Sequence, residues 1–465
     1  MADGCSSHSI ETCGAARVNT NDKSDAKKER RPAPQRHTTS RLGRFAKLSS
    51  MTAGVTARQV TTRVVSAFQN EEDAEAARKR ALEQSADQIV ETMGQLKGAA
   101  MKVGQMLSAD PEVLPEELSD ALSRLQAEAP PMDFDTVKSV VEEALDAPLD
   151  ELFTEFSREP IGAASIGQVH RGRTIDGMDV AVKVQYPGIS HTIESDMKNL
   201  GSLLQLARAK VSKERVDRYI REVTEVIKRE SDYLSEADTL ERFQIILKNV
   251  DGVRVPLPVH EYTRRTVLTM EYIEGMRLVD WMTDAPDEKR QEKAEQLIAA
   301  YLEMVHIHHT LHADPHPGNF LVDQDENVVF LDLGCVRDYD RGFSEGLIEV
   351  IESMWEADLD RLMAILEKME WEHNGIDPEL IYEWMELILT PLLEDEPVNF
   401  GEWRIHEKAM RFIKENPSFL GFAPPQEALF YVRVLAGLRG VLATTHASVN
   451  AYQIAQAAVC RLRAS

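Results

Sequence analysis

The chain has 465 residues, which is enough for two or three domains or for one two-lobed enzyme with extensions. Its net charge of -25 and its isoelectric point near 5.0 argue against a nucleic-acid binder, because affinity for a phosphate backbone requires clustered Lys and Arg. Its four cysteines do not form the pattern of a disulfide framework, which favours a reducing compartment.

The sequence predicts no transmembrane span. Even residues 430–449 are interrupted by Arg433, Arg439 and His446, so no run of eighteen uncharged apolar residues occurs. Residues 1–70 lack the apolar core of a signal peptide and are expected to form a disordered basic arm. We therefore expect a cytoplasmic protein whose contact with a membrane is at most peripheral.

Residues 71–150 are expected to form a helical extension. Apolar residues recur every three or four positions from about Glu71 to Leu107, and shorter helices are predicted at Leu114–Glu128 and Phe134–Leu145. The first helix contains Lys102-Val-Gly-Gln105, in which Lys102 and Gln105 share a face and the glycine favours close approach by another backbone. The alternative is a solvated Lys beside a packing Gly.

Residues 151–275 change to a strand pattern. Strands around Gly162–His170 and Asp179–Val184 flank a turn at Asp176-Gly177, and the second strand contains Val-Ala-Val-Lys183. This order is typical of the phosphate-covering hairpin of a kinase N-lobe, in which the Lys reaches the α- and β-phosphates. The residues expected to contact the nucleotide here are Gly162, Ala163, Ala164, Ser165, Ile166, Gly167, Gln168, Val169, Ala181 and Lys183.

The loop of this hairpin departs from the kinase pattern. Ala163, Ala164 and Ser165 stand where typical kinases place glycines. Each Cβ restricts backbone conformations with positive φ, so we expect a stiffer loop that holds nucleotide phosphates differently.

A carboxylate is needed to hold Lys183 in place. We expect it on a long amphipathic helix predicted at Val216–Asn249, where Glu230 is the first choice and Asp232 and Glu236 lie nearby in the chain. The alternative is a charged, solvated helix face.

Two further strands are predicted at Arg254–Val259 and Thr266–Glu271, leading to a hinge between lobes. Backbone groups of this hinge are expected to meet an adenine edge. The hinge residues are Met270, Glu271, Tyr272 and Ile273.

Residues 276–465 are expected to form a mostly helical C-lobe. A helix at Asp287–His309 leads to His312-Ala-Asp-Pro-His-Pro-Gly-Asn319, and Phe330-Leu-Asp332-Leu-Gly334 follows. An attacking hydroxyl needs an oriented acceptor, here Asp314, while Asn319 and Asp332 supply hard oxygen ligands for Mg²⁺. The alternative is that all three have only structural roles in a loop, a turn and a strand end.

The run Phe320–Leu331 reads as strand, acidic turn and strand, so Asn319 and Asp332 lie at the two ends of one hairpin. Five histidines lie near this loop, but their spacing gives no closed tetrahedral zinc set, and His312 is expected to pack and hydrogen-bond the catalytic loop. After Gly334 a helical pattern starts almost at once, at Phe343, which leaves no platform for a peptide substrate.

Together these motifs resemble the UbiB/AarF family of atypical kinases over roughly Gln88 to Arg461. The motifs that carry the resemblance are Lys102 to Gln105, Ser165 to His170, Val180 to Gln185, Glu230 to Tyr233 and His312 to Asn319. The resemblance implies an α+β, two-lobed protein-kinase-like fold with ATP and Mg²⁺ as cofactors. It also implies that the Lys102 helix lies across the active site, blocking peptide access, with Lys102 paired to acidic residues between Glu230 and Glu236.

Two departures from the family pattern stand out. Many bacterial members end in a transmembrane hairpin, which this chain is expected to lack, and Gly162 stands where the family often has another Ala. The residues expected to act in catalysis are Lys102, Lys183, Glu230 and Asp314.

The leading hypothesis is an Mg²⁺-dependent ATPase or small-molecule or lipid kinase, which the resemblance ties to isoprenoid-quinone or lipid metabolism. Its partners would be a nucleotide and a small-molecule, quinone-precursor or lipid ligand. The alternative is a nucleotide-sensing pseudokinase scaffold without an acceptor substrate, which an occluding helix would favour. An antibiotic-phosphorylating kinase of related fold is disfavoured because such enzymes lack the Lys102 helix.

Overall fold

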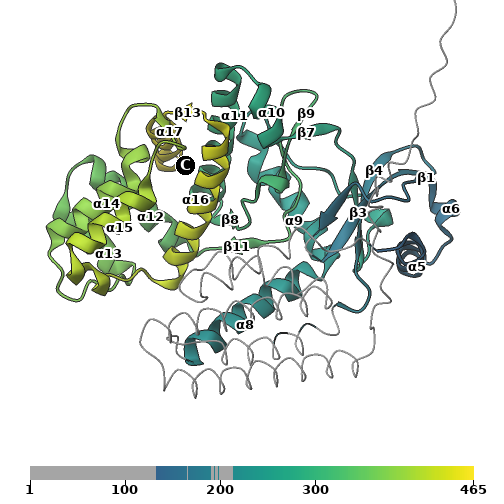
Figure 1. Cartoon of the computed structure of the whole chain (residues 1–465), viewed down its shortest axis with the longest axis horizontal. Coiled ribbons are helices and arrows are strands. Elements are labelled where there is room, and N and C mark those ends of the chain that lie inside the picture. The colour runs from purple at the N-terminus through teal and green to yellow at the C-terminus, as the bar shows by residue number, and fades with distance from the viewer. Residues whose placement is uncertain (1–131, 165, 190–192, 194–196, 198–212, 465) are drawn as a thin grey trace, which may run out of the picture. The chain divides into compact units, whose positions relative to one another are not determined.

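The computed structural model describes residues 132–464 except 165, 190–192, 194–196 and 198–212 (Figure 1). These residues belong to one compact unit of the chain. The predicted N-terminal arm, the helix bearing Lys102 and the helix predicted at Leu114–Glu128 lie outside the described residues.

The N-lobe is built on an antiparallel sheet. Its strand order is β1 (Phe153–Phe156), β3 (Gly167–Thr174), β4 (Asp179–Gln185) and β6 (Val267–Glu271), and β2 (Gly162–Ala164) also pairs with β3. The strands predicted around the small-residue loop are therefore confirmed as β2, β3 and β4. The turn between β3 and β4 has Gly177 at φ +86°, a conformation that glycine adopts readily.

Helix α5 (Phe134–Leu145) packs against β4 and β6 of this sheet. It begins as its sequence suggests, because the Asp133 side chain accepts the Thr136 N–H as an N-cap. Its apolar stripe, Val137, Val141 and Leu145, is buried. The short helix α6 (Leu149–Leu152) then leads into β1.

The single helix predicted at Val216–Asn249 is wrong, because the structure has two helices there. Helix α8 (Lys213–Glu230) ends before Asp232, and α9 (Tyr233–Ile246) begins after it. Asp232 has extended backbone angles, φ -118° and ψ 94°, and its side chain accepts the Leu234 N–H. Because the Asp232 side chain binds a backbone N–H of the next helix, α8 does not continue into α9. The break between the two helices lies between Glu230 and Glu236.

A second sheet joins the lobes. Its order is β5 (Val253–Arg254), β10 (Val328–Phe330), β9 (Phe320–Asp323) and β7 (Gly275–Arg277). In the chain, β5 comes before β6 and β7 comes after it. The backbone therefore passes from the second sheet to the N-lobe sheet and back again. The strand predicted at Arg254–Val259 is therefore shorter than expected and starts one residue earlier.

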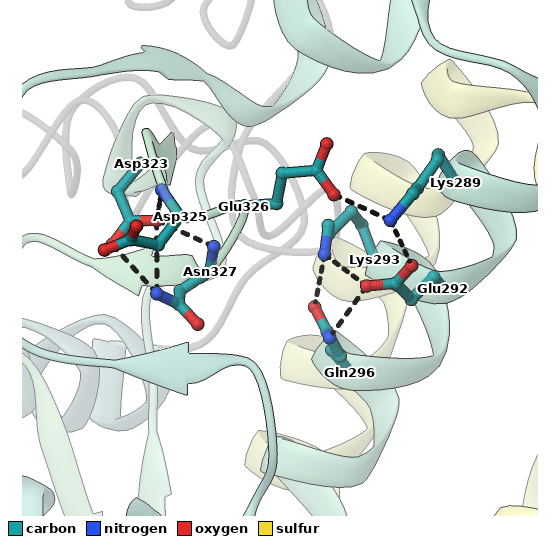
Figure 2. A network of polar contacts seen from close by, with 8 residues as sticks. All are labelled: Lys289, Glu292, Lys293, Gln296, Asp323, Asp325, Glu326 and Asn327. Carbon is teal, nitrogen blue, oxygen red and sulfur yellow. Dashed lines mark hydrogen bonds and ion pairs between the residues drawn. The ribbon is translucent and has the colours of Figure 1, made fainter.

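The turn of the β9–β10 hairpin is fastened to helix α11 (Asp287–Leu302) (Figure 2). Asp323 Oδ1 accepts the backbone N–H groups of Asp325 and Asn327 at 3.0 and 2.7 Å, which closes the turn. Glu326 at the tip lies 2.7 Å from Lys289 on the helix. The network continues along α11 through Glu292, Lys293 and Gln296 (Figure 2).

The rest of the C-lobe is mostly helical, as predicted. The helix expected at Asp287–His309 changes to a π-helical turn at Glu303–Ile307 and then meets β8 (Thr310–His312), which pairs with β11 (Val336–Asp338). No helix among the described residues is long and apolar enough to cross a membrane. The other elements are α10 (Leu278–Asp284), α12 (Arg341–Trp355), α13 (Leu359–Lys368), α14 (Pro378–Leu393), β12 (Val398–Asn399), α15 (Ile405–Glu415), α16 (Gln426–Thr445), β13 (Ser448–Val449) and α17 (Ala451–Ala464).

Candidate functional site

One face of the N-lobe sheet carries the residues expected to meet a nucleotide. In the strand register Val169 lies opposite Lys183, and Ala181 lies opposite Met270. Because side chains two residues apart share a face of a strand, these four side chains lie on one face of the sheet. Ala181, Lys183 and Met270 are buried and Val169 is half-buried, so this face is covered by other parts of the protein.

Lys183 connects three elements of the structure. Its Nζ lies 2.7 and 3.0 Å from the two carboxylate oxygens of Glu236 on α9, and 3.1 Å from Oδ2 of Asp332. Burial disfavours the charged ammonium, but the attraction of Asp332 and Glu236 outweighs it and raises the pKa of Lys183 well above its ordinary value. Lys183 is therefore charged at neutral pH and holds the N-lobe sheet to α9 and to the C-lobe motif.

The carboxylate that holds Lys183 is Glu236, so the choice of Glu230 was wrong. Glu236 lies in the first turn of α9, because the helix starts again after the Asp232 cap and turns this residue toward β4. Burial raises the pKa of Glu236 to about 7, although the nearby Lys183 opposes that shift. The N-cap at Asp232 is the sequence signal that could have predicted the new helix start.

Glu230 nevertheless belongs to the same cluster. It is buried, and its Cγ would lie 3.5 Å from a Cβ built on Gly334. That same point is 3.5 Å from Oε2 of Glu236 and 3.1 Å from Oδ1 of Asp332. Three acidic side chains therefore lie beside Gly334, where a side chain would have little room.

The catalytic-loop motif is folded by hydrogen bonds within its own sequence. The Asn319 side-chain amide donates to the Asp314 backbone carbonyl at 2.9 Å, and the Ala313 N–H donates to the carbonyl of Cys335 at 2.8 Å. The Leu331 N–H donates to the Asn319 carbonyl at 2.9 Å. This last bond brings Asn319 beside the residue that precedes Asp332, which confirms that the hairpin brings the two together.

His312 packs beneath this loop, as expected. It is fully buried, with the rings of Phe320 and Phe330 edge-on to it at 6.2 and 5.8 Å. Its Nδ1 is hydrogen-bonded to the Tyr301 hydroxyl on α11 at 3.0 Å, so it ties the loop to that helix.

Asp332 and Asn319 have the chemistry that a magnesium site requires. Asp332 Oδ1 accepts the Gly334 N–H at 2.9 Å, and Asn319 uses its amide nitrogen on Asp314, which leaves its amide oxygen for another partner. Among the described residues, no group of three or more His, Cys, Asp or Glu is placed to hold a metal ion. One carboxylate and one amide oxygen suit Mg²⁺, which takes its remaining ligands from phosphates and water.

The phosphate loop is a tight hairpin. Ala164 pairs with Gly167, so the two strands approach each other closely at this end; Ser165 lies outside the described residues. The described residues of this loop have no positive φ. A Cβ on Gly167 would overlap the backbone carbonyl of Val184, whereas a Cβ on Gly162 would meet nothing within 4 Å.

The side chain of Gln168 faces away from the nucleotide face. It is buried, its Oε1 accepts the Met132 N–H at 2.7 Å, and its Nε2 lies 2.8 Å from the His170 ring. The prediction of Gln168 as a nucleotide contact is therefore wrong for its side chain, because the period of two along β3 places it opposite to Val169.

The hinge is held by an ion pair that joins the two sheets. Arg254 Nη2 lies 2.7 and 2.8 Å from the Glu271 carboxylate, and its Nη1 lies 3.5 Å from Asp323 of β9. The backbone N–H groups of Glu271 and Tyr272 are bound to the carbonyls of Leu257 and Asp179, at 2.8 and 3.1 Å. Neither of these N–H groups is therefore free to meet a ligand.

The segment after Gly334 is short, as predicted. Residues 335–340 contain β11, which pairs with β8, and α12 starts at Arg341 with Asp340 as its N-cap. The helix begins two residues earlier than the sequence pattern suggested.

Comparisons with known proteins agree with this geometry. Residues 124–366 match the ABC1 atypical kinase-like domain. The chain is 30% identical over 376 residues to ACTIVITY OF BC1 COMPLEX KINASE 7, a chloroplastic protein of Arabidopsis thaliana, covering 80% of this chain and 53% of that protein. It is 29% identical over 380 residues to the mitochondrial atypical kinase coq-8 of Caenorhabditis elegans, covering 79% of this chain and 50% of that one.

A solved structure has a similar fold. The complex of Rv3197 with erythromycin from Mycobacterium tuberculosis matches with a TM-score of 0.60 and 25% sequence identity, over 83% of this chain and 98% of that one. The α+β kinase-like fold is thereby confirmed. The chain spans only about half the length of the plant relative and of the nematode relative. The activities of those whole proteins are therefore not assigned to this chain.

Proposed function

Because the chain belongs to the ABC1 atypical kinase-like family, we propose that it is an Mg²⁺-dependent ATPase or a small-molecule or lipid kinase. The observation that carries this proposal is the buried Lys183 held by both Glu236 and Asp332. A kinase needs its Lys fixed by a helix carboxylate and its metal-binding Asp close by. Both conditions are met by residues from two lobes.

Each residue then has a role in the transfer. Lys183 would bind the α- and β-phosphates, with Glu236 fixing its direction, while Asp332 and Asn319 would hold Mg²⁺. The metal supplies charge neutralisation on the phosphates. Asp314, at the start of the loop that Asn319 closes, would orient the attacking hydroxyl or water.

The adenine would be held by the hinge backbone. Since the N–H groups of Glu271 and Tyr272 are already bound, the carbonyl of Glu271 and the N–H of Ile273 are the groups that would meet its edge. Val169, Ala181 and Met270 would supply the apolar walls, because they share the face on which Lys183 lies. Ala163 and Ala164 would cover the phosphates with a stiffer loop than a glycine-rich one.

The acceptor would be a small molecule rather than a peptide. Residues 336–338 pair with β8 and α12 starts at Arg341, so the segment after Gly334 would be too short to form a peptide platform. From the family resemblance we propose an isoprenoid-quinone precursor or a lipid as the acceptor class, with residues 71–131 covering the site through Lys102.

A second candidate is a nucleotide sensor without an acceptor. The contact of 3.1 Å between Lys183 and Asp332 favours it, because this contact uses a carboxylate oxygen that a metal would need. Nucleotide binding would then replace this contact and change the protein's conformation without transfer.

One experiment separates the two candidates. The pure protein is incubated with Mg²⁺ and ATP labelled at the γ-phosphate, with and without a cell lipid extract, and both phosphate release and labelled lipid are measured. Turnover that Asp332→Asn removes supports the enzyme. Tight nucleotide binding with neither phosphate release nor labelled product supports the sensor, and absence of nucleotide binding refutes both.

A further inference from the structure

Helix α16, far along the chain, touches the catalytic loop at one point. A Cβ built on Gly437 would lie 2.7 Å from Cγ of Pro315 and 3.6 Å from its Cδ. Pro315 directly follows Asp314. Nonbonded carbons pack at about 3.5–4.0 Å, so any side chain at position 437 would force the Pro315 ring or the helix to move.

The same helix also lies against the segment that follows Gly334. The guanidinium of Arg337, on β11, lies 4.8 Å from the centre of the Phe430 ring and 4.0 Å from the Glu427 carboxylate. Figure 1 shows α16, in yellow, passing close to β11. One helix therefore contacts both segments that present the catalytic loop and the Asp332 motif.

Glycine is an unfavourable residue in the interior of a helix, since Ala would stabilise the same position. Helix α16 nevertheless has two, Gly437 and Gly440. A Cβ on Gly440 would meet nothing within 4 Å, so only Gly437 has a steric reason to lack one.

We propose that Gly437 is a positioning residue for phosphoryl transfer: by lacking a side chain, it lets α16 support Pro315 and thereby sets the position of Asp314. This inference rests on the proposed function for its kinetic part. The contact itself rests only on the structure. The Pro ring is rigid, so a displacement at Pro315 passes directly to the neighbouring Asp314 backbone.

The test compares Gly437→Ala with the matched control Gly440→Ala. Both variants add one methyl group to the same helix. Gly440→Ala should raise Tm by about 1–3 °C with parent kcat, because it gains helix propensity and meets no neighbour. Gly437→Ala should gain no thermal stability, and its kcat should fall roughly 10- to 100-fold with nucleotide affinity within about twofold of the parent.

A second pair of variants separates positioning from a general packing defect. Pro315→Ala removes the ring atoms that the new methyl group would strike, so Gly437→Ala in that background should cost almost nothing in kcat. The idea is overturned if Gly437→Ala behaves like Gly440→Ala in both Tm and kcat, or if Pro315→Ala fails to relieve its effect.

Failure of the proposed function would look different. If the parent protein turns over no ATP, the kinetic role of Gly437 is refuted along with it. The steric contact would still be read from the difference in Tm between the two glycine variants and its loss in the Pro315→Ala background.

Discussion

The replacement Glu236→Gln tests the central contact of the site. Gln is close in size to Glu and can still accept a hydrogen bond from Lys183, but it carries no charge. The pair is buried, with Nζ 2.7 and 3.0 Å from the two carboxylate oxygens, so the lost interaction is screened little by solvent.

The expected magnitude follows from what remains. Removing one member of a buried ion pair lowers the free energy of unfolding by about 3–5 kcal/mol when the other charge is left without a partner. Lys183 keeps Asp332 at 3.1 Å, so we expect a smaller loss, about 2–3 kcal/mol. If all of this loss falls on transition-state stabilisation, kcat/KM drops by about 30- to 150-fold, at about 1.36 kcal/mol per factor of ten.

The assay is Mg²⁺-dependent ATP hydrolysis measured across pH, with Glu230→Gln as the comparison. Burial raises the pKa of Glu236 to about 7, so its ionised, Lys-binding form is reached only as pH rises through that value. In the parent, kcat/KM should therefore rise with pH through about 7 and then level off. Glu236→Gln should lose this limb, and Glu230→Gln should keep it.

Two results would refute the reasoning. If Glu230→Gln lowers kcat/KM more than Glu236→Gln, then Glu230 is the functional partner of Lys183 despite the geometry. If the Glu236→Gln profile keeps its rise near pH 7, the group that titrates there is another one.

Three further predictions concern the metal, the loop and the N-terminal extension. Asp332→Asn should lower Mg²⁺-dependent ATP turnover by on the order of 100-fold, because an amide is a neutral and poorer ligand for a hard dication; parent-like turnover with Mg²⁺ would show that Asp332 is no metal ligand. Gly167→Ala should lower the free energy of unfolding by about 1–3 kcal/mol in chemical denaturation, since its methyl group would strike the Val184 carbonyl, whereas Gly162→Ala should change it little. Lys102→Ala should shift both nucleotide affinity and turnover, measured by titration and by phosphate release; if melting temperature, binding and hydrolysis all match the parent, Lys102 is a solvated residue.

Much of the N-lobe could be predicted because its signals are local. The period of two along β3 and β4, and the Asp176-Gly177 turn between them, specify which residues pair and which share a face. The hairpin that joins Asn319 to Asp332 is equally local, since two short apolar strands with an acidic turn between them suffice to fold the chain back.

The partner of Lys183 could not be chosen in this way. Glu230 and Glu236 lie six residues apart in one charged run, and their order along the chain does not say which faces β4. The chain changes direction at Asp232, the N-cap of α9. The backbone angles of this single residue decide how α9 is oriented. The parallel pairing of β5 with β10 and the approach of Gly437 to Pro315 are longer-range still, and no local pattern specifies them.

The charge balance around Gly334 connects these observations. Glu230, Glu236 and Asp332 lie beside that glycine. Lys183 forms ion pairs with two of them, Glu236 and Asp332. Carboxylates brought together in a buried place require compensating positive charge or protonation, and the pKa of about 7 at Glu236 is one sign of that requirement. Burial of these carboxylates beside Lys183 therefore explains in one way both the raised pKa of Glu236 and the raised pKa of Lys183.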